Sequence, residues 1–494
     1  MSLSPPLPPR TIIPACKELA TVPKVADALR CFARLPWCLL FESAREVDRE
    51  RETPFPISRY SFLVADPVET LQESVGSPSA IENLKNFYRR FEMEPLEGLP
   101  PFQGGLAGLF SYDLNQSIEL IPSNRYIDFQ IPSIAVGMYD VVLAWDHWQA
   151  RAWLISLGIE ADGRISSERA QSRLSLFESY LNGSDAIETN RQLTRNAPLS
   201  QIASPQFATE FSDRLTSNFQ KKEYLQSVQK CIDYIDAGDV FQINLAQRLL
   251  SPAACDSIYL YENLKRCNPA PFASYFQFEP SEKEAAFEIV SSSPERFLAV
   301  RAGKVESRPI KGTRRRTGFP IVDLQSKREL MASEKDFAEN TMIVDLMRND
   351  LSRVCLDDSV LVSQFCQLEE YESVLHLVSA IEGTIRPECD LIDLLACTFP
   401  GGSITGAPKI RAMEIIAELE PTSRGAYCGS IGYLGFNGNA DLSILIRTIT
   451  ACDGWWQIPV GGGIVSQSDP MNEYEETWTK ATGMLKAIFA GDDK

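Results

Sequence analysis

Two stretches of the chain carry paired acidic side chains at a spacing that suits a bound cation. In EKDFAENTMIVDLMRND, Asp336 and Glu339 lie three residues apart, and Ile343 and Met347 continue the same helical face. Both carboxylates therefore head an otherwise apolar, inward-facing stripe, where an acid needs a cation. The alternative is a charged helix N-terminus, which the helix dipole favours.

The second stretch, NEYEETWTKATGMLKAI, places Glu473 and Glu476 on one helical face with Lys480, while Glu475 points away. An ordinary surface ion pair between Glu476 and Lys480 is the alternative. The chain has only two histidines and no thiolate cluster, so oxygen is the ligand type that remains. Oxygen ligands alone suit Mg²⁺, and two acidic helix starts in one chain indicate such a site.

Glycine-rich segments supply a second kind of site. TFPGGSITGAPKIRAMEII puts Gly401, Gly402 and Gly406 before a helix with Pro408 in its first turn, so free N–H groups could hold an anion. PVGGGIVSQSDP offers another close approach of backbone. Together with Arg447 and Lys480, these segments could cradle a dicarboxylate. Tight turns are the alternative for both.

Lys311 lies in PIKGTRRR, between an extended Pro-Ile pair and a Gly-Thr turn. A solvated surface lysine is its simplest interpretation. Of the two histidines, His147 follows a strand-like run and is predicted to be structural. His376 lies in the apolar run YESVLHLVSAIEG, where a buried structural histidine is common; between two anion sites its ring could also contact a substrate or carry a proton.

Composition narrows the classes of function. The 494 residues are 44% hydrophobic, enough for a large core. The formal net charge of −18 argues against nucleic-acid partners, because these require positive faces. The twelve cysteines form no regular framework, as in reduced cytosolic enzymes. Without a secretion-signal pattern or a long apolar run, we expect a cytoplasmic protein with no membrane partner.

The elements that position these residues divide at a polar segment. Residues 185–218 are predicted to be a linker between an N-terminal region, 15–184, and a catalytic region, 219–490. The first region has strand-like runs and a helix near 81–91. In the second, strands alternate with helical patterns, and Asn437-Gly438 is a strong hairpin signal. The predicted helices span 221–237, 336–353, 408–419 and 472–489. We expect an α+β fold of antiparallel sheets with helices packed outside.

The motifs, taken together, resemble the chorismate-utilising enzymes. SSSPERFL, PIKGTRRR, AENTMIVDLMRNDL, HLVS, TFPGGSITGAPKIRAMEII, GSIGYLGFNG and GGGIVSQSDPMNEYEETWTKA occur in the family's order. GGLAGLFSYDL resembles the N-terminal region of the large components of anthranilate synthase and aminodeoxychorismate synthase. The resemblance covers roughly residues 30–490 and implies a two-subdomain sandwich of antiparallel β-sheets flanked by helices.

The resemblance also implies roles for individual residues. Glu339 and Glu476 resemble Mg²⁺ ligands, with Asp336 and Glu473 beside them. Glu295 resembles the general acid near the C4 hydroxyl of chorismate, and His376 resembles the active-site histidine. The residues that resemble those holding or lining the substrate are Thr405, Gly406, Ala407, Tyr433, Arg447, Gly461, Gly462, Gly463 and Lys480.

Two positions distinguish reactions within this family. Family members that add water to chorismate typically have a lysine that acts as a base at the position of Gln242. A neutral amide cannot deprotonate water, so ammonia is the expected nucleophile. At the positions that match residues 309–313 of this chain, the large components of anthranilate synthase typically have a sequence similar to PIAGT. Those of aminodeoxychorismate synthase typically have a sequence similar to PIKGT, as this chain does. We expect Lys311 to attack C2, Glu295 to protonate the departing C4 hydroxyl, and ammonia to enter at C4, giving 4-amino-4-deoxychorismate. Anthranilate formation is the nearest alternative; a silent ligand-binding relative and a polyanion-binding KGTRRR patch are weaker ones.

Two partners follow from the resemblance. We find no G-x-C-x-G elbow with a partner histidine, so ammonia is expected from a separate glutamine amidotransferase subunit or from solution. The segments LLFES and NPAPF resemble those that bind tryptophan in the family. The residues concerned are Glu42, Ser43, Asn268, Pro269 and Phe272. A strand end and a proline-rich turn are a sufficient structural alternative.

Overall fold

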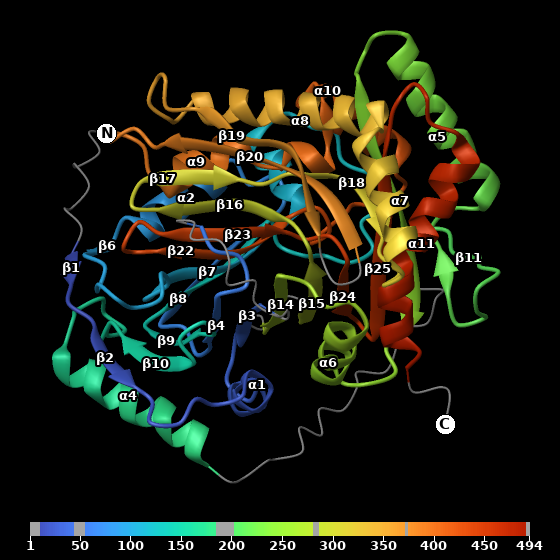
Figure 1. Cartoon of the computed structure of the whole chain (residues 1–494). Helices are drawn as coiled ribbons and strands as arrows, with labels where there is room; N and C mark the ends of the chain where they lie inside the picture. Colours follow the sequence, from blue (N-terminus) through green and yellow to red (C-terminus); the bar gives the residue numbers. More distant parts are fainter. Residues whose placement is uncertain (1–9, 44–54, 184–201, 280–285, 371–373, 491–494) are drawn as a thin grey trace.

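The computed structural model describes residues 10–43, 55–183, 202–279, 286–370 and 374–490. Among these residues, two large sheets face each other and helices cover their outer sides (Figure 1). Every strand pair within the two large sheets is antiparallel. The predicted α+β sandwich with helices outside is confirmed.

The larger sheet has thirteen strands within the described residues. Their order is β11 (Phe207–Ala208), β12 (Thr216–Ser217), β13 (Gln242–Pro252), β25 (Trp455–Ile464), β24 (Thr448–Cys452), β15 (Phe287–Ser293), β14 (Phe272–Phe278), β3 (Leu39–Glu42), β4 (Tyr60–Val64), β9 (Val141–Asp146), β10 (Arg151–Ser156) and β2 (Ala15–Glu18), with β21 (Gly406–Ala407) paired to β13.

The second sheet has ten described strands. Their order is β18 (Ile310–Arg315), β20 (Val374–Thr384), β17 (Lys304–Ser307), β16 (Arg296–Arg301), β23 (Ala440–Ile444), β22 (Ser430–Gly435), β7 (Gly105–Phe110), β8 (Ile134–Tyr139) and β5 (Glu69–Glu73), with β19 (Leu361–Glu370) also paired to β20. A separate parallel pair joins β1 (Arg10–Ile12) to β6 (Phe91–Met93).

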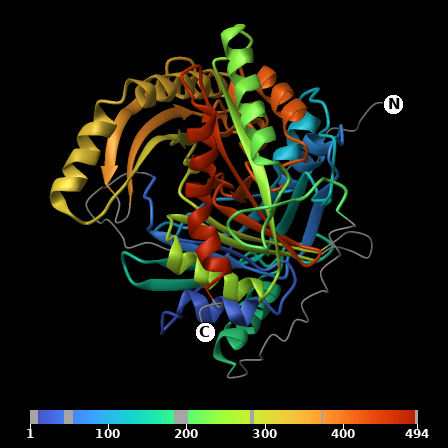
Figure 2. The ribbon, with the colours of Figure 1, turned by 90° about the vertical axis from the view of Figure 1, so that its right-hand side faces the viewer.

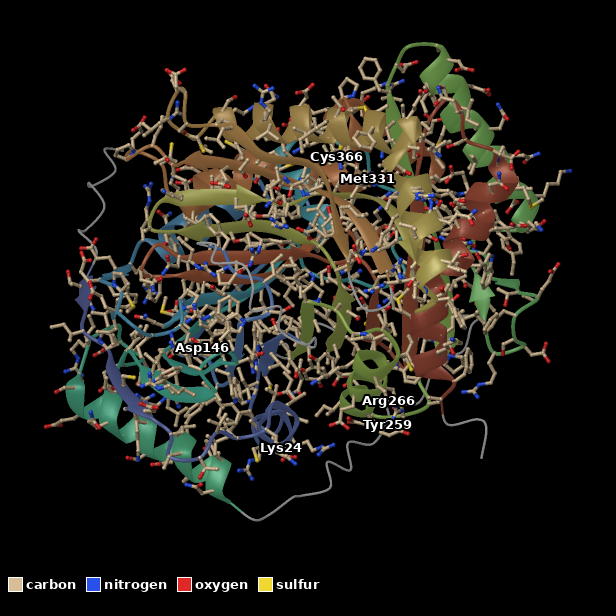
Figure 3. The ribbon with its side chains drawn as sticks, in the orientation of Figure 1. Lys24, Asp146, Tyr259, Arg266, Met331 and Cys366 are labelled. Carbon is tan, nitrogen blue, oxygen red and sulfur yellow. The ribbon has the colours of Figure 1, made fainter. Side chains whose placement is uncertain are left out.

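The helices lie outside the sandwich. Their bounds are α1 (Val25–Phe32), α2 (Ala80–Tyr88), α3 (Asn115–Ile118), α4 (Ser167–Asn182), α5 (Lys221–Asp236), α6 (Ser257–Cys267), α7 (Pro320–Met331), α8 (Glu334–Ser352), α9 (Leu391–Thr398), α10 (Lys409–Leu419) and α11 (Pro470–Ile488). Figure 2 looks onto α11, with α5 beside it and α7 and α8 arching along the outer side of the curved strands. Outward side chains such as Tyr259 of α6 and Met331 of α7 are about half exposed (Figure 3).

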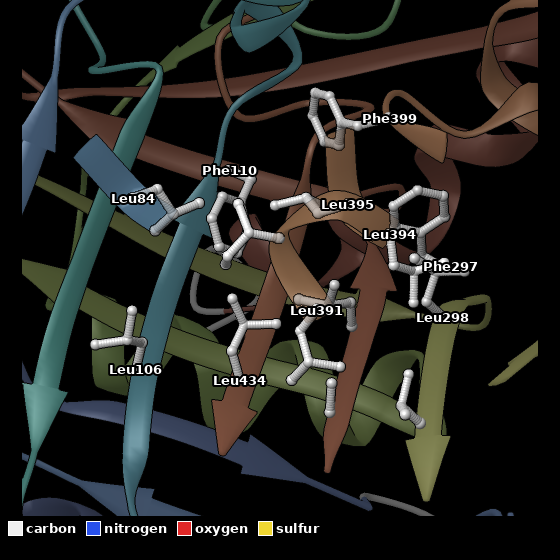
Figure 4. Close-up of a cluster of buried hydrophobic side chains, with 14 of the residues drawn as sticks. Leu84, Leu106, Phe110, Phe297, Leu298, Leu391, Leu394, Leu395, Phe399 and Leu434 are labelled. Carbon is white, nitrogen blue, oxygen red and sulfur yellow. The ribbon is translucent and has the colours of Figure 1, made fainter. Parts of the chain in front are cut away.

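Three apolar layers hold the fold together. Between the sheets, residues such as Phe62, Leu109 and Phe276 are almost fully buried. The outer face of the ten-stranded sheet packs on α2, α8 and α9 through a leucine- and phenylalanine-rich cluster (Figure 4). The thirteen-stranded sheet packs its outer face on α1, α4, α6 and α11. Each sheet is therefore covered on both sides, which keeps its strands away from water.

The two sequence regions share both sheets. Strand β3 pairs with β14, and β7 pairs with β22, so strands from before and after the predicted linker lie side by side. The first half of the predicted linker, residues 185–201, falls outside the described residues, and the second half contains β11 and β12. The two regions thus contribute to a common framework rather than to separate sheets.

Several elements begin or turn at the residues that short sequence motifs indicate. The Asn437-Gly438 turn joins β22 to β23, with Gly438 at a φ of +73°. Ser333 and Asp469 accept hydrogen bonds from the first turns of α8 and α11, as N-cap residues do. Pro408 is the N-cap of α10 and not within its first turn. No described helix is both long and apolar enough to cross a bilayer.

Candidate active site

The acids of α8 and α11 meet above the glycine run of β25. A Cβ on Gly462 would lie 3.3 Å from Glu473 Oε2, 3.5 Å from Lys480 Nζ and 3.6 Å from Glu476 Oε1. From α8, Lys335 Nζ lies 3.6 Å from Glu473 Oε1 and 3.9 Å from Glu339 Oε1. The sequence reasoning did not single out Lys335, which brings the two acidic helix starts together.

The acids are paired with cations. Lys480 Nζ lies 2.6 Å from Glu476 Oε1 and donates to the Gly461 carbonyl oxygen at 2.9 Å, so the i,i+4 pair considered above is present. Arg314 lies 3.2 Å from Asp336 Oδ2. No group of three or more His, Cys, Asp or Glu side chains in the described part of the chain is arranged to hold a metal ion. The donors themselves, carboxylate oxygens from two facing helix starts, are of the type that Mg²⁺ prefers.

Lys311 is turned inward by a bulge in β18. The register against β20 shifts between Lys311 and Thr313, and Gly312 between them has a φ of +74°. Lys311 Nζ donates to the Ser403 carbonyl oxygen at 3.3 Å. Burial lowers the pKa of Lys311, and the charges of Glu339 and Glu295 partly oppose that shift. The surface-lysine interpretation does not describe this side chain.

Glu295, like Lys311, contacts Ser403. It is 4% exposed, and its Oε1 has no hydrogen-bond partner. Burial raises the pKa of Glu295 to about 7, although a hydrogen bond from Ser403 and the charge of Lys311 act in the other direction. A carboxyl group with such a pKa can hold a proton at neutral pH and deliver it to a departing hydroxyl.

His376 is close to Lys311 along the sheet. It lies on β20, is 7% exposed, and its Nδ1 is 2.9 Å from Thr313 Oγ1. Thr313 follows Lys311 by two residues on the neighbouring strand. The structure therefore places His376 on the strand next to that of the lysine, between β18 and β19. His147, predicted to be structural, has its Nε2 2.7 Å from Ser61 Oγ.

The turn before α10 packs against β13. Gly406 has a φ of +150°, and a Cβ there would lie 2.1 Å from the Gln242 carbonyl oxygen, so only glycine fits. Thr405 is fully buried, and its hydroxyl donates to the Gly401 carbonyl oxygen at 3.0 Å. Ala407 pairs with Gln242, whose own Oε1 is buried without a hydrogen-bond partner.

β13 and β25 join this turn to the acidic helices. A Cβ on Gly463 would lie 2.5 Å from Gln242 Nε2, and Gly461 pairs with Ala246. Arg447 is placed by a backbone φ of +54°. Burial lowers the pKa of Arg447, while the charges of Tyr427 and Glu476 oppose the shift. The structure thus gathers most of the predicted substrate residues around β25.

Tyr433 is the exception. It lines a separate cavity, together with Glu42, Ser43 and Phe272 of the predicted tryptophan segments. Its ring stacks on Phe102, with the ring centroids 4.3 Å apart. Tyr433 therefore lies apart from the residues around β25, and its role in holding the substrate carboxylates stays a prediction. Strand β22, which carries Tyr433, belongs to the other sheet.

The second cavity contains charges that the sequence reasoning missed. Arg296 pairs with Asp441 at 2.9 Å, and both line the cavity. Glu42 accepts a hydrogen bond from Tyr261 at 2.7 Å and is ion-paired with Lys265. Asn268 and Pro269 do not line the cavity. Charged residues inside the apolar runs of β16 and β23 were the available signal, because a buried charge needs a partner.

Comparison with known proteins agrees with this geometry. Residues 39–486 match the family described as chorismate binding enzyme. The chain belongs to the chorismate-binding enzyme family. Aminodeoxychorismate synthase component 1 of Salmonella typhimurium is 38% identical over 92% of this chain and 93% of its own. Anthranilate synthase component 1 of Thermus thermophilus is 36% identical over 94% of this chain and 95% of its own.

A solved structure supports the same family. Anthranilate synthase component I from Streptococcus pneumoniae superimposes with a TM-score of 0.72 at 28% identity, covering 89% of this chain and 95% of its own. As a chorismate-binding enzyme, the protein uses chorismate chemistry, and its family fold is the sandwich described above. The relatives are named for two different synthases. The residues of the site must therefore distinguish which of the two reactions this protein catalyses.

Proposed function

We propose that the protein is an aminodeoxychorismate synthase large component, which converts chorismate and ammonia to 4-amino-4-deoxychorismate, a precursor of p-aminobenzoate and folate. The observation that carries the proposal is Lys311, an inward-facing amine between Glu295 and the acidic helix starts. Burial favours its neutral form, which is the form that can act as a nucleophile. The 38% identity to an aminodeoxychorismate synthase component 1 supports it.

The reaction has two balanced displacements. The Lys311 amine forms a bond to C2 as a secondary ammonium, both conjugated ring double bonds shift by one position, and the C4 hydroxyl leaves as water with the proton of Glu295. Ammonia then forms a bond to C4, both double bonds return, and Lys311 departs from C2 as a neutral amine. The new C4 ammonium returns a proton to Glu295. The enolpyruvyl ether is retained. Gln242, a neutral amide, has no basicity to activate water as a competing nucleophile.

The other residues bind and orient the substrate. Arg447, Lys480 and the N–H groups of Gly461, Gly462 and Gly463 provide positive charge and donors for the two carboxylates. Thr405, Gly406 and Ala407 line the opposite wall, and His376 supplies a ring nitrogen. Glu339 and Glu476, with Asp336 and Glu473, would hold Mg²⁺, which supplies countercharge to the substrate when bound. In the structure, Lys335 and Lys480 form ion pairs with three of these acids. The carboxylates are therefore arranged around positive charge, which fits a bound cation.

The relatives are named component 1, and this supports a partner component that delivers ammonia from glutamine. The second cavity, with Glu42, Ser43, Phe272 and Tyr433, is the proposed place for tryptophan. A cytoplasmic location remains a prediction.

The experiment is incubation of the protein with chorismate, Mg²⁺ and ammonium salt, followed by mass analysis. Aminodeoxychorismate is the expected product. Anthranilate with release of pyruvate would instead support the second candidate, anthranilate synthase, which the 36% identity to the Thermus enzyme favours.

A further inference from the structure

A buried arginine outside the expected site residues connects three segments that build the site. Arg424 lies after α10, and its side chain is 3% exposed. Its Nε and Nη2 donate to the two carboxylate oxygens of Glu420, at 2.9 and 2.7 Å. This bidentate pair is fully enclosed, so the guanidinium has a fixed orientation.

The remaining donors of Arg424 go to main-chain carbonyl oxygens. Nη1 donates to Ile404 at 3.0 Å, and Nη2 donates to Asn244 at 2.8 Å. Glu420 in turn accepts the N–H of Ala246 at 2.8 Å. Ile404 belongs to the turn that carries Thr405 and Gly406, whereas Asn244 and Ala246 belong to β13. The ion pair therefore bridges the substrate turn and this strand, in addition to the backbone pairing of Gly406 and Ala407 with β13.

Asn244 extends the connection to Lys311. Its N–H donates to the Thr405 carbonyl oxygen at 2.8 Å, and its Nδ2 donates to the Ser403 carbonyl oxygen at 2.8 Å. Lys311 Nζ donates to the same Ser403 oxygen at 3.3 Å. Arg424 is thus joined to the proposed nucleophile through Asn244 and one shared carbonyl group.

The N-terminal region reaches the same arginine. The guanidinium lies 4.6 Å from the ring centroid of Tyr112, in the GLFSYDL motif. Asp113 accepts the N–H of Gly425 at 3.0 Å, and Gly425 in turn accepts the N–H of Tyr112 at 2.8 Å. The motif therefore has a structural connection to the site although none of its residues lines it.

We propose that Arg424, held by Glu420, is a positioning residue that fixes the Ser403–Ala407 turn against β13 and thereby orients Lys311 and the substrate. The role rests on the proposed function. Arg424 touches no reacting atom, so its loss acts on the geometry of the turn and not on any single chemical group.

The matched control is Arg248, another buried arginine, which lies on β13. It is ion-paired with Asp128, donates to Ser204 Oγ at 3.0 Å and lies 5.2 Å from the Phe129 ring centroid. It thus resembles Arg424 in burial, pairing and aromatic contact, but it contacts neither the turn nor Lys311. Alanine and lysine variants of both arginines would be compared by thermal unfolding, calorimetric chorismate affinity and turnover with Mg²⁺ and ammonium.

We expect Arg424→Ala and Arg424→Lys to lose about tenfold or more in kcat, because a misplaced nucleophile loses reactivity. A lysine has one ammonium and cannot reach Glu420 and both carbonyls. Arg248 variants should lower the melting temperature comparably yet keep kcat within about twofold. Methylguanidinium should restore part of the activity of Arg424→Ala and none to Arg248→Ala.

A kcat of Arg424→Lys equal to that of the wild type would overturn the positioning role. Equal losses of kcat in the Arg424 and Arg248 variants, with no restoration by methylguanidinium, would also overturn it. A wild-type protein that makes no amino product would instead contradict the proposed function. In that case the affinity for chorismate still tests the role of Arg424. Equal affinities of the wild type and Arg424→Lys would exclude that role.

Discussion

The Glu295 carboxyl group and the Lys311 amino group interact inside the protein, and each moves the other's pKa against the effect of burial. Both also interact with Ser403, through a hydrogen bond to Glu295 and a 3.3 Å contact from Lys311 Nζ to the carbonyl oxygen. Burial thus lowers the pKa of Lys311 and raises that of Glu295, so it favours the neutral form of both groups. This arrangement suits a pair in which one group attacks as a neutral amine and the other donates a proton.

Replacing Lys311 with alanine removes the proposed nucleophile. We expect aminodeoxychorismate formation to fall by about 10³-fold or more, because a covalent route cannot proceed without its nucleophile. Lys327→Ala is a suitable control, since Lys327 of α7 forms a partly exposed ion pair with Glu370 at the end of β19. Mass analysis of the products separates the outcomes. An unchanged yield of amino product from Lys311→Ala would show that the lysine forms no bond to the ring.

The acidity of Glu295 predicts a pH dependence. With its pKa raised to about 7, the group is protonated below that value and ionised above it. Proton donation to the leaving hydroxyl should therefore decline as the pH rises through about 7, and kcat/KM should fall with it. Glu295→Gln should abolish turnover. A profile that rises through this range would contradict a role for Glu295 as the acid.

The same shift affects stability. Because the folded-state pKa lies above the ordinary value of 4.5, the folded protein binds this proton more tightly, and the stabilisation present below pH 4.5 is lost as the pH rises through about 7. The loss amounts to at most about 3 kcal/mol. Glu295→Gln should remove it, so the melting temperatures of wild type and variant should diverge between pH 5 and pH 8. Parallel curves would argue against the raised pKa.

The acidic helix starts predict how the metal binds. Glu339→Gln and Glu476→Gln should each weaken Mg²⁺ binding by about 100-fold or more, because each removes a charged oxygen ligand. Glu475→Gln, on the exposed side of α11, should leave binding unchanged. Calorimetric titration with Mg²⁺ in the presence of chorismate measures the difference. Full Mg²⁺ affinity in Glu339→Gln would remove these residues from the metal site.

Local sequence patterns predicted the elements well. The helices at 221–237, 336–353 and 472–489 agree within two residues with α5, α8 and α11. Each is governed by side-chain periodicity and a capping residue, which act within a few positions. The spacing of the acids on each helix followed from the same periodicity, whereas Lys335, which lies between Glu339 and Glu473, was not singled out.

Long-range pairing was not readable from these patterns. Nothing in LLFES or GGLAGLFSYDL indicates that their strands pair with strands more than two hundred residues later, since register is set by the packing of whole sheets. For that reason Tyr433 was expected beside Arg447, although it faces the second cavity. The bulge at Gly312 and the position of Lys335 between two helices likewise depend on tertiary contacts.

Gly462 provides a direct test of the substrate site. Alanine there would place a methyl group 3.3 to 3.6 Å from Glu473, Lys480 and Glu476, distances that the fold can accommodate but that occupy the space over β25. We expect the KM for chorismate to rise about tenfold or more, with little change in melting temperature.

Gly438→Ala is the opposite case. Its φ of +73° makes alanine unfavourable by about 1 kcal/mol, while no neighbouring atom lies within 4 Å of the added Cβ. This variant should lose stability and keep its KM. If Gly462→Ala instead lost stability and kept its affinity for chorismate, the glycine run would be a packing feature of β25 and β13 and not the wall of a substrate site.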